Sequence, residues 1–134
     1  MARVVVLDAS VVVALFDDTD SHHDWAVSVF IDTTGDQLLM SSLTMAEVFV
    51  YPARADRLDS FQTALSDLAI DAVELGPQDA IALATLRAQT ALKMPDAVVL
   101  HTARRHQATL ATADSTLASV ATEHGCRVLR PDQI

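Results

Sequence analysis

Four acidic residues follow expected strands or lie near the starts of expected helices. Asp8 comes directly after the apolar run RVVVL, and Asp114 lies two residues beyond ATLAT. Asp96 follows Pro95 where an apolar helical pattern begins, and Glu47 lies about one turn inside the helix expected after QLLM. Ligands of parallel α/β sheets bind at the carboxyl ends of the strands. All four carboxylates could therefore face one cleft.

Such a cluster would have a definite chemistry. Neighbouring carboxylates repel one another, and their pKa values rise unless cations lie among them. Hard oxygen ligands suit Mg²⁺ or Mn²⁺, and one or two such ions can activate a water and offset charge on a phosphodiester. No cysteine–histidine spacing in the chain suggests zinc. The pattern predicts a site for one or two Mg²⁺ or Mn²⁺ ions.

Each acid also has a purely structural interpretation. Asp8 and Asp114 could cap the helices that follow them, and Asp96 could favour a helix N-terminus. Glu47 could complete a capping box with Thr44. These interpretations explain each acid singly, but they do not explain why all four follow the same pattern. Apolar residues flank Glu47 on both sides, which predicts that it does not lie on a fully solvated face.

Strand and helix patterns alternate along the chain. The expected strands are 3–7, 37–40, 72–75, 108–112 and 126–130. The expected helices are 9–16, 22–32, one within 41–55 that begins at Ser42 or Thr44, 57–69, 77–92, 95–107, and one that Asp114 starts and Gly125 stops. Pro52 should kink or end its helix. The alternation predicts an α/β fold: a mostly parallel sheet of four to five strands with helices on both faces.

Composition limits the class of protein. The 134 residues (1–134) are expected to form one domain, and with 51% apolar but only 4% aromatic residues its core must be aliphatic. The single cysteine, Cys126, indicates a reducing compartment, and Asp8 and Ser10 interrupt the apolar N-terminal run, so we expect a cytoplasmic protein without a membrane span. The net charge of −9 suits basic partners or bound cations and normally repels nucleic acid.

Four stretches, VVVLDASVVVAL, SSLTMAEV, LKMPDAVVLHTA and ATLATADSTL, resemble in order and spacing a PIN-domain ribonuclease, most closely the VapC toxins of bacterial toxin–antitoxin pairs. The resemblance covers nearly the whole chain. It implies that Asp8, Glu47, Asp96 and Asp114 bind Mg²⁺ or Mn²⁺ and that Ser10 and Thr112 orient carboxylates or water. The implied reaction is hydrolysis of an RNA phosphodiester by metal-activated water, which would inhibit translation.

The resemblance also implies partners. Family members usually form homodimers and are silenced by an antitoxin whose basic tail reaches the acidic cleft. RNA would need local cations, for which the candidates are Lys93, Arg54, Arg57, Arg104 and Arg105, although each could be an ordinary surface charge. Thr116 stands where some relatives carry a further acid, and Pro52 is not expected in this family. The sequence leaves open the role of His101, the RNA and the number of metal ions.

Two other classes of protein are alternatives to a nuclease. A receiver or haloacid-type phosphoryl-transfer domain needs a late lysine, but Lys93 is the only lysine and precedes a helix instead of ending a strand. The haloacid pattern also needs a second aspartate where Ser10 stands. The other alternative is a catalytically inactive PIN-like scaffold that binds proteins. Such scaffolds commonly lose part of the acidic quartet, whereas all four acids are present here.

Overall fold

The sheet of this computed structural model, which describes residues 2–131, has five parallel strands in the order β3-β2-β1-β4-β5. The strands are β1 (Val4–Leu7), β2 (Gln37–Ser41), β3 (Ile70–Val73), β4 (Thr109–Ala111) and β5 (Val128–Leu129). The predicted α/β fold with a mostly parallel sheet is therefore confirmed.

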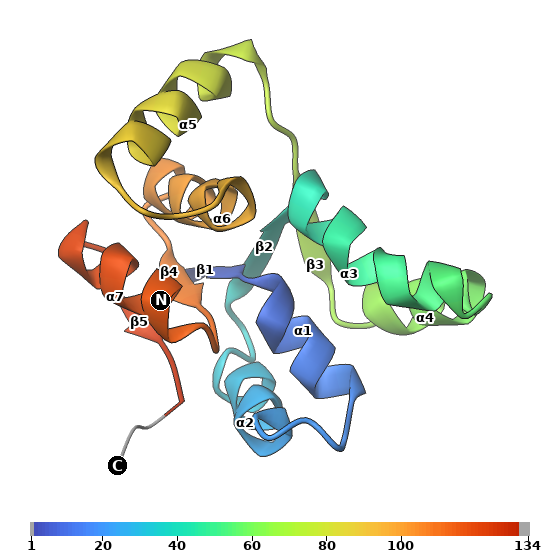
Figure 1. Cartoon of the computed structure of the whole chain (residues 1–134). Coiled ribbons are helices and arrows are strands. Elements are labelled where there is room, and N and C mark those ends of the chain that lie inside the picture. Colours follow the sequence, from blue (N-terminus) through green and yellow to red (C-terminus); the bar gives the residue numbers. More distant parts are fainter. Residues whose placement is uncertain (1, 132–134) are drawn as a thin grey trace.

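Helices cover both faces of this sheet (Figure 1). They are α1 (Ala9–Phe16), α2 (His23–Asp32), α3 (Ser42–Arg54), α4 (Leu58–Ser66), α5 (Pro77–Gln89), α6 (Met94–Arg105) and α7 (Ser115–Glu123). Side chains of α1 to α4 pack on one face, and those of α5 to α7 pack on the other. None of these helices is long and apolar enough to span a membrane.

The central strand β1 explains why the N-terminal run is continuously apolar. Val5 and Leu7 point to the α1–α4 side, while Val6 points to the α5–α7 side. All three side chains are buried. A parallel strand covered on both faces needs apolar residues at every position instead of at alternate ones. The two cores together are aliphatic, as the composition predicted.

The structure corrects several predicted boundaries. Strand β3 lies two residues earlier than predicted, and β5 has only two residues. Helix α3 is capped by Ser41, whose hydroxyl accepts from the Thr44 N–H, so the predicted caps at Ser42 or Thr44 are wrong. The helix does not end at Pro52 but continues to Arg54. A proline this close to the C-terminus removes only one helical hydrogen bond of the last turns.

The end of α7 was predicted correctly. The helix stops at Glu123, His124 caps it, and Gly125 follows with a φ of +84°. This left-handed conformation suits glycine because it has no Cβ to clash with the backbone. The turn leads the chain into β5 at the edge of the sheet.

The packing of β4 between the two cores yields a stability prediction. Leu110 is 0% exposed and contacts the α6 and α7 side chains of the core. We expect Leu110→Ala to lower the free energy of unfolding by about 2–5 kcal/mol, because it removes buried methyl groups and leaves a cavity. Ile81→Ala is the matched control: Ile81 is 75% exposed, and its loss should change stability by less than about 0.5 kcal/mol. Urea denaturation followed by circular dichroism measures both, and equal losses would contradict the assignment of the core.

Candidate functional site

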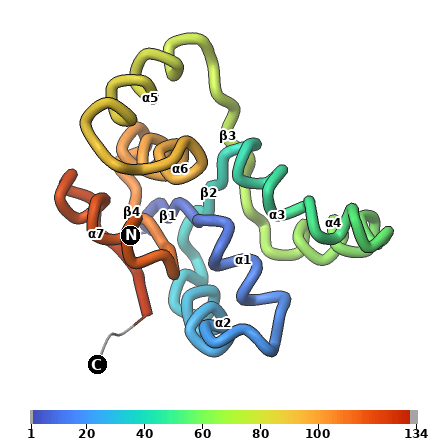
Figure 2. Tube along the Cα trace, viewed as in Figure 1, coloured from blue at the N-terminus to red at the C-terminus, as the bar shows by residue number. Residues whose placement is uncertain are grey.

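The strand order changes direction beside β1. The chain adds β2 and then β3 on one side of β1, and later adds β4 and β5 on the other side. Figure 2 shows β2 and β4 on opposite sides of β1. Parallel sheets bind ligands outside the carboxyl ends of the strands at such a point, because the connections leave in opposite directions and open a crevice. Asp8 follows β1 here, and its N–H donates to the Ala111 carbonyl of β4 at 2.9 Å.

Asp8 is held by three hydrogen bonds. It caps α1, where its Oδ1 accepts from the Ala9 N–H at 2.8 Å. Its Oδ2 accepts from the Ser10 hydroxyl at 2.8 Å and from the Thr112 hydroxyl at 2.7 Å. The residue is only 7% exposed, so these donors replace the water that a buried carboxylate loses. Ser10 and Thr112 thus fix the orientation of this carboxylate.

Asp114 is linked to Asp8 through the same hydroxyls. The Thr112 hydroxyl, while donating to Asp8, accepts from the Asp114 N–H at 3.0 Å. The Ser10 hydroxyl likewise accepts from the Ala113 N–H at 3.0 Å. The side chain of Asp114 caps α7, with Oδ1 accepting from the Leu117 N–H at 3.0 Å. The structural role predicted for Asp114 is therefore present, and its second oxygen takes no hydrogen bond from residues 2–131.

Asp96 shows most directly that the acids share a site. It lies in the first turn of α6, and its pKa is raised to about 6. Burial is the largest cause, followed by the negative charges of Asp8, Asp114 and Glu47, while Lys93 acts in the opposite direction. Charges that influence one carboxyl group in this way lie close to it. The structure therefore brings all four predicted acids to the same end of the sheet, where the carboxyl ends of the strands lie.

Glu47 lies at the rim of this group. It is the sixth residue of α3 and is exposed, but its carboxyl group is partly shielded from water, which agrees with the prediction that it does not lie on a fully solvated face. Its apolar neighbour Val48 is buried instead, because it occupies the adjacent core-facing side of the helix. The cap at Ser41 also excludes the capping box with Thr44. Partial loss of hydration raises the pKa of Glu47, and the Asp8 charge adds to this shift.

The donor chemistry of these residues fits a hard divalent cation. In this conformation no three histidine, cysteine or acidic side chains within residues 2–131 are arranged as ligands of one metal ion. Asp96 and Glu47 accept no hydrogen bond from that part of the chain. Burial is the largest cause of the raised pKa of Asp96, and an ion would relieve the further contribution of the charges of Asp8, Asp114 and Glu47. The donor types therefore fit such an ion.

The candidate RNA-contacting residues are spread over the molecule. Lys93 precedes α6 and is close enough to lower the pKa of Asp96, so it lies beside the acids. Arg54 and Arg57 are exposed where α3 leads into α4. Arg104 and Arg105 lie in the last turn of α6. Since a helix rises about 1.5 Å per residue, they are roughly 12 Å from Asp96 along the axis.

A buried acid that the sequence patterns did not identify, Asp79, links α5 to α6. Asp79 is 2% exposed and accepts from the Gly76 N–H at 2.6 Å. It also contacts His101 Nε2 at 2.7 Å and Arg105 at 3.5 Å, and the hydrogen bond with His101 is the main reason that its pKa is lowered. His101 therefore packs between helices instead of facing the acids. An acid three residues after Gly76 at a Pro-initiated helix is the signal that could have identified Asp79.

Comparison with known proteins assigns the fold to a family. The profile of the PIN domain matches residues 5–127. No curated protein matches the chain at a significant level. The family resemblance inferred from the four sequence stretches is thereby confirmed.

Several solved structures share this fold at low sequence identity. A toxin–antitoxin complex from Klebsiella pneumoniae is 24% identical, has a TM-score of 0.74, and the match covers 97% of this chain and 99% of that one. VapC20 of Mycobacterium tuberculosis, a sarcin-ricin loop cleaving toxin, is 13% identical with a TM-score of 0.73 and coverage of 95% and 99%. FitAcB of Neisseria gonorrhoeae is 18% identical with a TM-score of 0.72 and coverage of 93% and 96%. At these identities the likeness shows the fold.

The raised pKa of Asp96 predicts how stability depends on pH without metal. Between its usual value of 3.8 and its folded value of about 6, the folded chain binds more protons than the unfolded chain. Its contribution to the free energy of unfolding therefore falls as pH rises through this window and stays low above it. We expect Asp96→Asn in EDTA to be more stable than the wild type by roughly 1 kcal/mol at pH 7.5, a modest gain because the carboxyl is only partly shielded.

Urea denaturation at pH 7.5 and pH 4.5 measures this effect. The gain should shrink at pH 4.5, where the folded carboxyl is protonated. Asp32→Asn makes the same chemical change at an exposed position in the last turn of α2, and it controls for the loss of one negative charge. An equal gain for Asp96→Asn at both pH values would show that ionisation is not its source.

Proposed function

Because the chain belongs to the PIN domain family, we propose that it is a metal-dependent endoribonuclease that hydrolyses RNA phosphodiester bonds. The observation that carries this proposal is the arrangement of the acids: the Thr112 hydroxyl links Asp8 after β1 to Asp114 after β4, and Asp96 lies in the first turn of α6. Burial and the charges of Asp8, Asp114 and Glu47 raise the pKa of Asp96 to about 6. A structural protein gains nothing from holding like charges together. A nuclease uses them to bind cations that offset phosphate charge.

The proposed ligands of one or two Mg²⁺ or Mn²⁺ ions are Asp8, Glu47, Asp96 and Asp114. When bound, such an ion would polarise the phosphate and lower the pKa of a water molecule. Asp8 supplies the fixed point, since the Ser10 and Thr112 hydroxyls restrict its rotation. Asp96 and Glu47 supply oxygens that take no hydrogen bond from the described part of the chain. These two side chains can adapt to the ion and to the substrate.

RNA must approach an acidic protein. Cations at the four carboxylates would neutralise the cleft locally, but much of the net charge of −9 would remain. The basic residue beside the acids is Lys93, and we propose that it guides a phosphate next to the cut bond. Arg54 and Arg57 are the candidates for contacts farther along the RNA. Arg104 and Arg105 are weaker candidates, because they lie at the opposite end of α6.

We also propose that the protein is the toxin of a toxin–antitoxin pair that acts in the cytoplasm and inhibits translation. The similar structures from K. pneumoniae and N. gonorrhoeae support this, and the sarcin-ricin loop cleaved by VapC20 suggests RNA of the translation machinery as the substrate class. The acidic surface suits a basic segment of an antitoxin, which would occupy the cleft. A homodimer is the proposed assembly.

The central test is cleavage of total bacterial RNA by purified protein. We expect the wild type with Mg²⁺ or Mn²⁺ to make discrete cuts that EDTA abolishes. Asp96→Asn keeps the shape of the side chain but removes its charge, and it should cut at least about a hundredfold more slowly. Sequencing of the cut ends measures the cleavage and identifies the RNA. Asp32→Asn should cut like the wild type, because Asp32 ends α2 and lies near the amino end of β2, away from the acids at the carboxyl ends of the strands.

Each outcome of this experiment has a distinct meaning. Intact RNA in the presence of folded, antitoxin-free wild type would favour the alternative of a protein-binding scaffold. Equal cutting by the wild type and Asp96→Asn would remove Asp96 from the active site. Cutting that persists in EDTA would contradict the proposed role of the metal.

The Thr112 hydroxyl gives a second, independent test. Thr112→Val removes the donor to Asp8 at nearly constant shape, so Asp8 loses its fixed orientation. We expect metal affinity and cleavage to fall about tenfold to a hundredfold, as for other residues that orient metal ligands. Thr112→Ser keeps the hydroxyl and should restore most of the activity. Calorimetric titration with Mn²⁺ and the cleavage assay measure the two effects, and a fully active Thr112→Val would contradict this role.

A further inference from the structure

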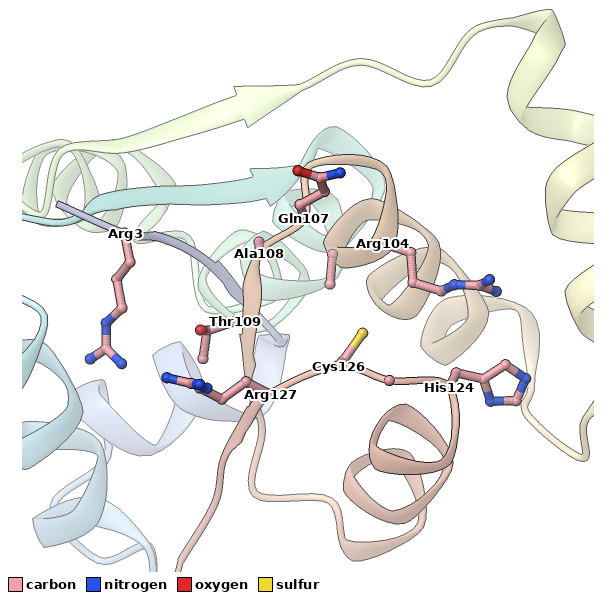
Figure 3. Close-up of a pocket in the computed structure, with 10 residues that line it drawn as sticks. Arg3, Arg104, Gln107, Ala108, Thr109, His124, Cys126 and Arg127 are labelled. Atoms are coloured by element: carbon pink, nitrogen blue, oxygen red, sulfur yellow. The ribbon is translucent and has the colours of Figure 1, made fainter. Parts of the chain in front are cut away.

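A cavity lies at the amino ends of the strands, whereas the acids lie at their carboxyl ends. The cavity has a volume of about 480 Å³ and opens beside the amino ends of β4 and β5 and the residue before β1 (Figure 3). Its volume is within the range of small-molecule sites, roughly 300–1,000 Å³. No aspartate or glutamate lines it. The cavity is therefore separate from the proposed metal site in both position and chemistry.

Cationic side chains dominate the polar lining. Arg3, Arg104 and Arg127 contribute three of the nine lysines and arginines of the chain, and His124 adds an imidazole. Arg3 donates to Asp36 at 2.9 Å, which offsets its charge. Arg104 and Arg127 pair with no carboxylate within residues 2–131. In a chain with a net charge of −9, two exposed guanidinium groups beside one cavity, neither with an acidic partner in the described part of the chain, would suit an anionic ligand.

The side chains are placed to contact a ligand of some length. In Figure 3, Arg3 and Arg127 extend to one side of the cavity, and Arg104 and His124 extend to the other. Thr109 and Cys126 lie between these pairs, and the Thr109 residue is buried. A ligand could thus place an anionic group against one pair and its remaining part over the wall formed by Thr109, Cys126 and Ala108.

We propose that this cavity binds a small molecule that carries a phosphate group, with a mononucleotide as the representative ligand. The planar guanidinium group binds phosphate oxygens through two parallel hydrogen bonds, which favours phosphate over a simple halide. The buried residues 97–100 of α6 lie between Asp96 and the cavity-lining Arg104. None of the four proposed metal ligands lines the cavity, so binding there can be tested apart from cleavage.

Binding should be measured on the full chain in EDTA, so that no metal at the acidic edge can hold a phosphate. The probes are AMP, inorganic phosphate and adenosine, titrated by calorimetry and by NMR. We expect AMP to bind and adenosine not to bind. The Arg104→Gln/Arg127→Gln double variant should bind AMP about tenfold or more weakly, because it removes a charged hydrogen-bond donor from whichever pair holds the phosphate. The two single variants identify that pair. Arg130→Gln makes the same charge change at a residue that does not line the cavity and should leave the affinity unchanged.

Cys126 provides a second measurement, because it is the only cysteine and lines the cavity. Bound AMP should slow its alkylation by iodoacetamide in the wild type and not in the Arg104→Gln/Arg127→Gln double variant. Circular dichroism and urea denaturation show that the variants are folded.

The three probes also distinguish the source of the phosphate. Inorganic phosphate that binds as tightly as AMP would identify a site for the free anion, and tighter binding of AMP would identify a nucleotide site. Either result supports the proposal. Equal binding of adenosine and AMP, wild-type affinity in the double variant, or no binding of either phosphate-bearing probe would overturn it.

Discussion

The hydrogen bond from Thr112 to Asp8 is the contact on which the arrangement of the four acids depends. It joins residues 104 positions apart in the chain, one after β1 and one after β4. The same hydroxyl accepts from the Asp114 N–H, so it also places the start of α7. A buried carboxylate without such donors would be costly, because nothing would replace its lost hydration. Asp8 therefore obtains this hydrogen-bond donor only when β1 pairs with β4 in the correct register.

The rest of the fold holds like charges close together against their repulsion. Two aliphatic cores cover both faces of the sheet, and helices α1, α6 and α7 begin beside Asp8, Asp96 and Asp114. The positive ends of these helices partly offset the negative charges, each by about 0.3–1 kcal/mol. Repulsion remains, since the charges of Asp8, Asp114 and Glu47 add to the effect of burial in raising the pKa of Asp96. The remaining repulsion is the property that makes a bound cation favourable.

Much of this architecture could be predicted from local patterns in the sequence. The apolar run before Asp8, the alternation of elements and the glycine after α7 each determine structure over a few residues. The cap at Ser41 is local, but Ser41, Ser42 and Thr44 are all residue types that cap helices, so the sequence pattern did not distinguish among them. The position of β3 depends on its pairing with β2, a distant segment, and it was predicted wrongly. The contact of Asp79 with His101 and the cavity beside Arg127 are likewise formed by segments far apart. Periodicity carries no information about such contacts.

Both sites follow from one geometric rule of the parallel sheet. A helix that connects parallel strands runs antiparallel to them, so its N-terminus lies at the carboxyl edge of the sheet and its C-terminus at the amino edge. Helix α6 illustrates this, with Asp96 in its first turn and Arg104 and Arg105 in its last. Each charge has the sign that the adjacent helix end favours. An acidic edge that attracts cations and a basic edge that attracts anions can therefore coexist on one small domain, separated by the length of its helices.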